Sequence, residues 1–328
     1  MRRRVLSGLF GVVLVSCATV PASTCLPATR GMACLRRAST AASVPGSGRP
    51  RDPDGLSPSR VRAMLRDFTD TLRRRYAVSD ERQLSASRRL AGRLVVPVRF
   101  HVVTDGLGHG HLTPSVVAAQ VRSLNAAYGG TTGGADTGVS FRLVSTDVVR
   151  DDQWFTRPHD NQAQMLGALA RGGPGTLNLF TASVGSEVLG FSSFPQWYHL
   201  RPTTDGVVVD YRSVPGGSFE HFNRGYTAVH EIGHWLGLFH PFENGCQAPG
   251  DGVDDTPYEA LPTLNCPAAK DTCPQPGTDL VHNFMDYAWD PCMTSFTPGQ
   301  GLRVRAMWAA YRAGPAAGQR SLAQPVTR

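Results

Sequence analysis

The sequence predicts an α+β fold, in which helices pack on a twisted, mixed β-sheet and an irregular, cysteine-rich segment follows. Two patterns support this prediction. Between residues 94 and 238, runs of β-branched residues alternate with stretches of helical periodicity. Residues 241–297 are instead rich in Gly, Pro, Asp and Cys, which favours little regular structure. The chain has 328 residues and is 41% hydrophobic, so it can bury a large core and is not wholly disordered.

Helices and strands can be placed in chain order. Ser57–Arg75 has apolar residues three and four apart, which predicts a helix. Leu94–Val103 is rich in β-branched residues and predicts the first strand. The next helix begins at Pro114, with Thr113 as its N-cap, and runs to about Ala127. The remaining expected elements are strands at Val139–Val149, Thr176–Val184 and Gly206–Tyr211 and helices at Asn161–Ala170, Thr227–Leu238 and Gln300–Tyr311.

Residues 1–22 have the pattern of a secretory signal peptide. Arg2–Arg4 precede the apolar run Val5–Val15, which is too short to span a bilayer. Small residues up to Ala22 offer an ordinary cleavage site, whereas the residues before Cys17 resemble a bacterial lipobox, which would leave a lipid anchor at the cell surface. Both alternatives imply export and permit disulfides, and no later stretch predicts a transmembrane segment.

Charge is distributed unevenly along the chain. Residues 1–90 contain 17 Arg and six acidic residues, whereas residues 91–328 contain 16 basic and 20 acidic residues. The net charge of +7 therefore comes from the front of the chain, and the remainder is mildly acidic. A surface that binds nucleic acid is not expected.

The front of the chain is interpreted as a pro-segment at residues 23–90. Its arginine clusters, Arg73–Arg75 and Arg88–Arg89, are the candidate maturation sites. Residues 91–315 then form the main folded domain, and residues 316–328 form a C-terminal tail.

Seven cysteines fall into two groups. Three lie near the N-terminus, and four lie within one 47-residue stretch: Cys246, Cys266, Cys273 and Cys292. Four cysteines in an exported domain most often form two disulfides, and the sequence leaves three pairings open. A cysteine-rich zinc cluster is the alternative, but CxxC-type pairs are absent from this stretch.

A catalytic zinc site is predicted by one eleven-residue pattern. His230 and His234 lie four residues apart on the expected helix, so both imidazoles project from one face and reach one ion. Gly237 ends the helix, and the chain then brings His240 round as a third nitrogen ligand. Three protein ligands leave a position for water, which distinguishes a catalytic site from a structural one. Glu231 can take the proton from that water as a general base.

A second element supports the zinc site. Met285 lies in the segment Asn283–Tyr287, 45 residues after His240, where a methionine turn is expected beneath three zinc-binding histidines. Alone, a methionine here would more often be ordinary core filling. Tyr287 is a candidate hydrogen-bond donor to the oxyanion on the attacked carbonyl, and its alternative role is packing at the rim of the cleft.

Together these residues resemble the pappalysin family of metzincin zinc metallopeptidases, and most closely its smaller, cytophagalysin-like secreted members. The resemblance is dense over about residues 225–305 and weaker back to about residue 94. Its matching segments are His230–Phe242, Asn244–Cys246, Gly250–Asp251, Asp255–Pro257, Cys266–Pro267, Asp271–Cys273, Asn283–Tyr287, Cys292–Met293 and Phe296–Gln300.

The resemblance implies an architecture and two disulfides. The family has an upper sheet subdomain and a lower, irregular subdomain, with zinc in the cleft between them. It implies disulfides equivalent to Cys246–Cys273 and Cys266–Cys292. It also implies bound calcium in the loop after the third histidine.

The residues of that loop agree with a hard cation. The oxygen ligands would come from Asp251, Val253, Asp254 and Thr256. A solvated acidic loop is an equally good interpretation of the same residues.

Two features depart from family members with known properties. Members that cleave before Arg or Lys carry an Asp just ahead of the last cysteine, where this chain has Pro291, with Asp290 one position earlier. Members that are kept latent use a cysteine of the pro-segment to block the zinc. Cys25 or Cys34 could take that role, but a Cys25–Cys34 disulfide is at least as good an interpretation.

The predicted function is a secreted zinc endopeptidase, made as a zymogen, that hydrolyses peptide bonds in extracellular proteins. Zinc is the expected cofactor, calcium a second candidate, and protein or peptide substrates the expected partners. The alternative is a lipid-anchored surface binding protein with a vestigial zinc site. The presence of all three histidines and of Glu231 argues against that alternative.

Overall fold

The computed structural model describes residues 55–87, 90, 92–185 and 188–313, all within one compact unit that spans Gly48–Arg328. Several predictions fall outside the described residues. These are the signal peptide, the tail at 316–328, the arginine pair at 88–89 and the three cysteines Cys17, Cys25 and Cys34.

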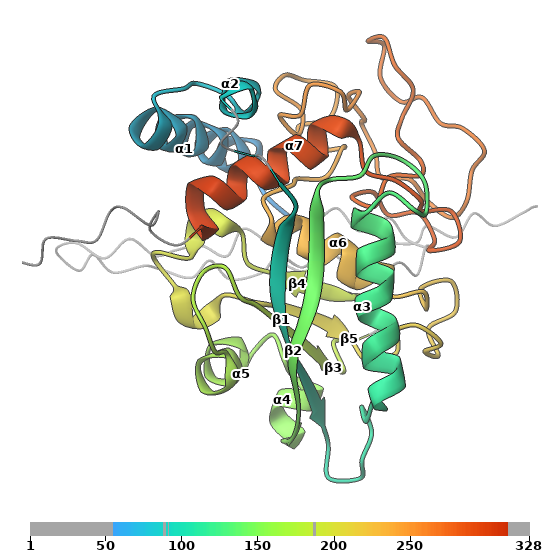
Figure 1. Ribbon diagram of the computed structural model, residues 1–328. Coiled ribbons are helices and arrows are strands. Elements are labelled where there is room, and N and C mark those ends of the chain that lie inside the picture. The colour runs from blue at the N-terminus through green and yellow to red at the C-terminus, as the bar shows by residue number, and fades with distance from the viewer. Residues whose placement is uncertain (1–54, 88–89, 91, 186–187, 314–328) are drawn as a thin grey trace, which may run out of the picture. The chain divides into compact units, whose positions relative to one another are not determined.

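The helices and strands alternate along the first two thirds of the described chain (Figure 1). The α-helices are α1 Pro58–Tyr76, α2 Glu81–Ala86, α3 Pro114–Tyr128, α4 Asp152–Thr156, α5 Gln162–Leu169, α6 Tyr226–Trp235 and α7 Pro298–Met307. The strands are β1 Leu94–Thr104, β2 Val139–Arg150, β3 Leu177–Ala182, β4 Gly190–Ser192 and β5 Val207–Asp210. Two 3₁₀ turns, η1 Pro195–Trp197 and η2 Pro202–Thr204, precede β5, and the π-helical turn η3 Trp308–Arg312 continues α7.

The five strands form one mixed sheet in the order β2-β1-β3-β5-β4. Four of them run parallel, and the short strand β4 pairs antiparallel with β5 at one edge. The alternation of helices and strands explains the parallel pairs, because a parallel connection needs a crossover. The predicted mixed sheet is therefore confirmed, with a single reversed strand at the edge that faces the functional residues.

Helices cover both faces of the sheet. Leu177 and Leu179 of β3 pack towards α3 and α6, whereas Phe180 and Ala182 of the same strand pack towards α4 and α5. Because side chains alternate along a strand, a strand covered on both faces is apolar throughout, and β3 is fully buried. Strand β2 lies at the opposite edge from β4. Only Val139 and Phe141, near its start, are buried.

The predicted long elements are confirmed to within a few residues. The short ones were missed, because three to six residues carry too little periodicity to be recognised: α2, α4, β4 and both 3₁₀ turns. Thr113 occupies the N-cap position of α3, as expected, although its hydroxyl bonds to Ser115 instead of capping a backbone N–H.

The lower segment, residues 241–297, is irregular as predicted. In it the described chain forms an isolated bridge between Asn283 and Ser295 and no helix or longer strand. The two disulfides join Cys246 to Cys273 and Cys266 to Cys292, the pairing that the family resemblance implied. They tie down a segment that has little secondary structure of its own.

The helical hairpin α1–α2 lies beside α7 (Figure 1). Phe68 and Leu72 of α1 and Leu84 of α2 pack with Met307 and Ala310 in one buried cluster. An ion pair between Glu81 and Arg303, at 2.7 Å, lies in the same largely buried interface. These helices, which the sequence analysis places in the expected pro-segment, thus share a buried cluster with α7 and η3.

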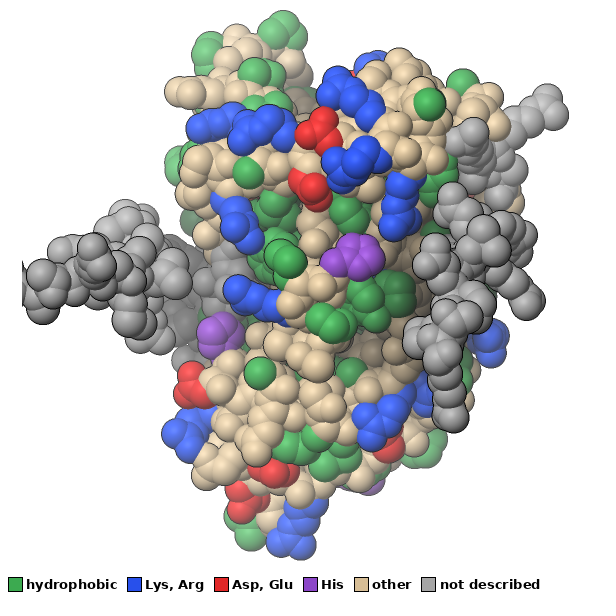
Figure 2. All heavy atoms as spheres, turned by 90° about the vertical axis from the view of Figure 1, so that its left-hand side faces the viewer, with side chains coloured by type: hydrophobic (Ala, Val, Ile, Leu, Met, Phe, Trp, Pro, Cys, Tyr) green, Lys and Arg blue, Asp and Glu red, His purple; other side chains and the backbone are tan. Residues whose placement is uncertain are grey.

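The arginines at the end of α1 are exposed, as predicted for Arg73–Arg75. Figure 2 views the molecule from the side on which α1 lies in Figure 1. Basic side chains, with acidic ones among them, cover the upper part of that side. All three arginines nevertheless belong to the last turn of the helix. Among the described helices, none is both long and apolar enough to cross a bilayer.

Candidate metal centre

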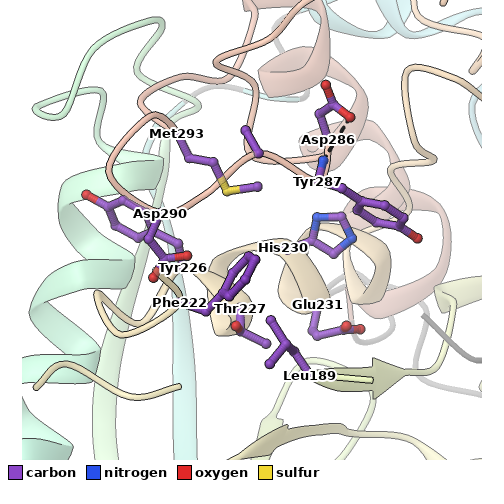
Figure 3. Close-up of a pocket in the computed structure, with 11 residues that line it drawn as sticks. Leu189, Phe222, Tyr226, Thr227, His230, Glu231, Asp286, Tyr287, Asp290 and Met293 are labelled. Carbon is purple, nitrogen blue, oxygen red and sulfur yellow. Dashed lines mark hydrogen bonds between the residues drawn. The ribbon is translucent and has the colours of Figure 1, made fainter. Parts of the chain in front are cut away.

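Helix α6 carries the first two histidines on one face. His230 and His234 are one turn apart, and both side chains are buried, with residue exposures of 6% and 5%. The helix packs against β5 and β4 at one edge of the sheet, and Figure 3 shows His230 pointing from the helix into the pocket.

The chain leaves the helix at Gly237. Its φ of +96° lies in the left-handed region, and a Cβ at this position would come 2.6 Å from the Cγ of Met307. Glycine is therefore required here by both conformation and space. The turn sends the chain back towards the helix, so that His240 reaches the first two histidines, as predicted.

The three imidazoles converge through the same ring nitrogen. The Nε2 atom of His234 lies 3.2 Å from that of His230 and 3.1 Å from that of His240. Within the described residues, these three form the cluster with metal-ligand geometry.

Each Nδ1 atom has a partner on the side away from this point. His230 Nδ1 lies 2.7 Å from the carbonyl oxygen of Phe284, and His234 Nδ1 lies 2.8 Å from that of Leu238. A carbonyl oxygen only accepts, so both Nδ1 atoms donate and both Nε2 atoms keep a lone pair. His240 Nδ1 lies 2.9 Å from Oε1 of Glu243, with the same consequence.

The donor set fits zinc. In a tetrahedral zinc site with bonds of about 2.0–2.1 Å, two nitrogen ligands lie about 3.3 Å apart, close to the observed separations. Three neutral imidazoles with oriented lone pairs are the ligands of an open, catalytic zinc site.

Glu231 lies against the edge strand. Its residue exposure is 2%, and a Cβ on Gly190 of β4 would come 2.8 Å from its Cγ and 3.0 Å from its Oε1. The carboxylate therefore lies between the zinc-binding helix and the first residue of β4. Figure 3 shows it pointing into the same pocket as His230.

The methionine turn lies beneath α6. The Sδ atom of Met285 occupies the space where a side chain on Gly233 would begin. Its backbone N–H donates to Oδ1 of Asn283, and Asn283 exchanges two side-chain hydrogen bonds with Gln300 at the start of α7. Helix α7 thus holds the methionine turn in place against Gly233 of α6.

Tyr287 faces the histidines. Its hydroxyl oxygen lies 3.3 Å from Nε2 of His240, and its ring packs on the rings of His230 and Phe242. The hydroxyl is thus beside the metal-binding nitrogens, where a donor to a substrate oxygen is useful.

A small pocket of about 40 Å³ opens beside these groups (Figure 3). On one side it is lined by His230, Glu231 and Tyr287. Its other walls are largely apolar, with two aspartates, and comprise Leu189, Phe222, Tyr226, Thr227, Asp286, Ala288, Asp290 and Met293. A mainly apolar pocket beside a few convergent polar groups is typical of a substrate site.

Asp290 is the buried carboxyl group at the far wall. It accepts a hydrogen bond from the backbone N–H of Arg224, at 2.7 Å, and another from that of Tyr226, the first residue of α6. The N-cap residue Gly225 has no side chain to do this. Burial raises the pKa of Asp290 to about 7. Pro291, the residue just ahead of Cys292, is exposed and does not line the pocket. Asp290, one position earlier, does line it.

The loop predicted to hold calcium centres on Asp251. Its buried Oδ1 accepts from the backbone N–H of Val253, at 2.9 Å, and from the hydroxyl of Thr256, at 2.6 Å. Its Oδ2 is buried and has no hydrogen-bond partner among the described residues. Burial raises the pKa of Asp251 to about 7. Asp254 is exposed and pairs with Arg82 of α2 at 2.9 Å, so its carboxylate does not join Asp251.

Comparison with known proteins agrees with this site. The family profile described as pregnancy-associated plasma protein-A, Peptidase_M43, matches residues 213–309. An extracellular metalloprotease of Arthroderma benhamiae is 37% identical over 244 residues, which are 73% of this chain and 80% of the relative. The chain belongs to the pappalysin family of metalloproteases. Another such relative, from Verticillium alfalfae, is 41% identical over 226 residues, 66% of this chain and 77% of its own.

Solved pappalysin-like structures share the fold. Mature mirolysin of Tannerella forsythia, in complex with a cleaved peptide, superposes with a TM-score of 0.61 and 24% identity over 68% of this chain and 96% of its own. A promirolysin mutant superposes with a TM-score of 0.59 and 23% identity over 75% and 92% of the two chains. The predicted metzincin-type fold is confirmed by these superpositions.

Sequence reasoning missed two residues that contact the candidate site. Glu243 was not noticed, although it follows His240 by three residues after a proline, a spacing that predicts a tight turn. Gly190 was not noticed because its importance comes from its closeness to Glu231, which depends on how strand and helix pack.

Proposed function

We propose that the three histidines hold a catalytic zinc ion and that Glu231 and Tyr287 act on the peptide bond. The observation that carries this proposal is the convergence of three Nε2 lone pairs, each fixed by a partner on Nδ1. Membership of a metalloprotease family supports the same reaction.

When bound, zinc supplies a Lewis acid for the scissile carbonyl and for water. Glu231 takes a proton from the attacking water as a bond forms between the water oxygen and the carbonyl carbon. The same carboxylic acid then gives this proton to the leaving nitrogen as the carbon–nitrogen bond breaks. The hydroxyl of Tyr287 donates a hydrogen bond to the carbonyl oxygen, which becomes negative in the transition state.

The edge strand β4 offers a place for the substrate backbone. It pairs with β5 on one side only and ends the sheet next to Glu231. We propose that an extended peptide adds to this edge and that the pocket takes the side chain next to the scissile bond. Its apolar walls suit a long side chain, and Asp290 offers one carboxyl group for a basic end.

The decisive experiment compares the purified protein with Glu231→Ala after the zinc content of both has been measured. Both are incubated with a denatured protein mixture, and the released peptides are mapped by mass spectrometry. Cleavage by the wild type alone supports the proposal, and the aligned cut sites show which side chain the pocket prefers. Equal cleavage patterns, or none from the zinc-loaded wild type even after the residues before Pro58 have been removed, overturn it.

We propose that the protein is secreted as a zymogen, which fits the signal-like N-terminus and the names of its extracellular relatives. A pro-form is also named for mirolysin, whose fold is similar. Since α1 and α2 bury Phe68, Leu72 and Leu84 in the core, we place the maturation cut before Pro58 rather than at Arg73–Arg75. Protein sequencing of the N-terminus of the secreted, active form tests this, and a start within α1, at Arg73–Arg75 or after Ala86 overturns it.

We also propose a calcium ion at Asp251. The buried, unpartnered Oδ2 supports an ion, and the loop around it offers the carbonyl oxygens of Val253 and Thr256. Calcium should raise the melting temperature of the zinc-loaded protein by several degrees. It should leave the melting temperature of the Asp251→Asn variant unchanged. The same melting temperature with and without calcium would remove this part of the proposal.

A further inference from the structure

The third histidine is positioned differently from the first two. His230 and His234 are fixed by the backbone of α6, whereas His240 lies in the loop that follows Gly237. A ligand on a loop needs other contacts to keep its ring in one orientation. The zinc motif by itself does not explain what holds the ring of His240 in one orientation.

A four-residue turn supplies these contacts. The backbone N–H of Glu243 donates to the carbonyl oxygen of His240 at 3.0 Å, and Pro241 occupies the second position of the turn, where its fixed φ is favourable. The ring of Phe242 stacks on that of His240, with centroids 4.6 Å apart and planes 9° from parallel.

The turn also returns the side chain of Glu243 to the ring. Its Oε1 lies 2.9 Å from Nδ1 of His240, and both side chains are largely buried, with exposures of 10% and 7%. The corresponding atoms of His230 and His234 face neutral carbonyl oxygens. His240 is therefore the histidine of the three whose Nδ1 faces a carboxylate.

We propose that Glu243 is the positioning residue for the third metal ligand. Its carboxylate accepts the Nδ1 hydrogen, fixes the tautomer that leaves Nε2 unprotonated, and prevents rotation of the ring. A charge-assisted bond from a carboxylate also makes the imidazole a better donor to a cation. The inference rests on the proposed zinc site and adds to it the residue that completes the site outside the helix.

Zinc affinity tests this inference without any measurement of proteolysis. The full chain is made with Glu231→Ala in all samples, so that self-digestion does not interfere. Glu243→Ala should weaken zinc binding about 10- to 100-fold, measured by competition with a chromophoric chelator. Glu243→Gln keeps an acceptor oxygen in the same place and should recover most of the lost affinity. Glu220→Ala removes an exposed glutamate and should bind zinc like the parent.

Cobalt provides the second readout. The visible absorption of bound Co²⁺ reports the geometry of its ligands, and Glu243→Ala should change this spectrum whereas Glu243→Gln should largely preserve it. Melting curves of the zinc-free variants show whether each is folded. A folded Glu243→Ala with parental zinc affinity and cobalt spectrum overturns the inference and leaves the proposed function intact. Failure of the parent itself to bind zinc would instead overturn the proposed function.

Discussion

Met285 and Gly233 share one small space beneath the zinc-binding helix. A Cβ on Gly233 would lie 2.2 Å from the Sδ and 3.0 Å from the Cε of Met285, far closer than atoms approach without displacement. Met285 is fully buried, so its thioether has little room to move away. The methionine turn, 52 residues further along the chain, therefore leaves no room for a side chain at Gly233 of the motif.

We expect Gly233→Ala to cost about 1–3 kcal/mol of the free energy of unfolding, because overpacking forces Met285 out of its place. Urea denaturation measures this loss. Gly167→Ala is the matched control, since Gly167 is an exposed helical residue with no atom near its missing Cβ, and it should gain about 0.5–1 kcal/mol. If the clash is the cause, adding Met285→Ala to Gly233→Ala should cost less than the two separate losses combined.

Gly190→Ala should impair catalysis more than metal binding. The new methyl group would press on Cγ and Oε1 of Glu231 and also on the carbonyl oxygen of Val208, at 2.9 Å. We expect a fall in kcat of at least about tenfold, because a general base works only when held in the correct position. Zinc content should stay at one ion per chain. Gly173→Ala, at an exposed glycine with open space around it, is the control, and equal activity of both variants would contradict the prediction.

The sequence was most informative where its periodicity was long. Strand Leu94–Thr104 and helix Pro114–Tyr128 were placed to within one residue, because β-branched runs and a Thr-Pro helix start act locally. Strand β4 was missed, since its three residues carry no pattern and it exists only by pairing with β5. The edge that faces the active site was therefore invisible to sequence reasoning.

In the candidate site, too, local patterns were predictable from the sequence and long-range contacts were not. Spacing alone brought His230, His234 and His240 together, because helix geometry and one glycine determine their arrangement. The disulfide pairing came from family resemblance, and spacing by itself left it open. The periodicity of Ser57–Arg75 predicted helix α1, but a local pattern does not reveal that Leu72 packs against residues more than 200 positions away.

The hairpin α1–α2 should therefore contribute to the stability of the whole domain. Leu72 is fully buried against α7 and η3, and Leu72→Ala should cost about 2–5 kcal/mol, the range for such cavities. The exposed Arg66 on the same helix provides the control, and Arg66→Ala should change the free energy of unfolding by less than about 0.5 kcal/mol. A loss no larger than the control's would mean that the hairpin detaches before the domain unfolds.

Asp290 should make stability depend on pH. Burial raises its pKa to about 7 in the folded protein, above the 3.8 of an exposed aspartate. Between pH 4 and pH 7 the unfolded chain therefore releases a proton that the folded protein keeps, so the contribution of Asp290 to the free energy of unfolding falls as the pH rises. Asp290→Asn has no such proton to release.

The difference in the free energy of unfolding, Asp290→Asn minus wild type, should thus become more favourable by a few kcal/mol from pH 4 to pH 8. Urea denaturation of the zinc-free proteins measures it, because protonation of the histidines would otherwise change zinc binding over this range. Asp271→Asn alters an exposed carboxylate, and its difference should stay flat. A flat difference for Asp290→Asn as well would show that its carboxyl group titrates like an exposed one.

Tyr287→Phe should separate transition-state stabilisation from metal binding. The variant loses only the hydroxyl that lies 3.3 Å from Nε2 of His240, while the ring contacts with Phe242 can remain. If the hydroxyl donates to the developing oxyanion, kcat should fall about 10²- to 10³-fold, with KM and zinc affinity nearly unchanged. Tyr211→Phe, on the far side of the sheet among Phe155 and its neighbours, should keep full activity. A rise in KM at constant kcat would instead assign Tyr287 to substrate binding, and a loss of zinc would assign it to holding His240. The three roles can be told apart because each affects a different one of the three measured quantities.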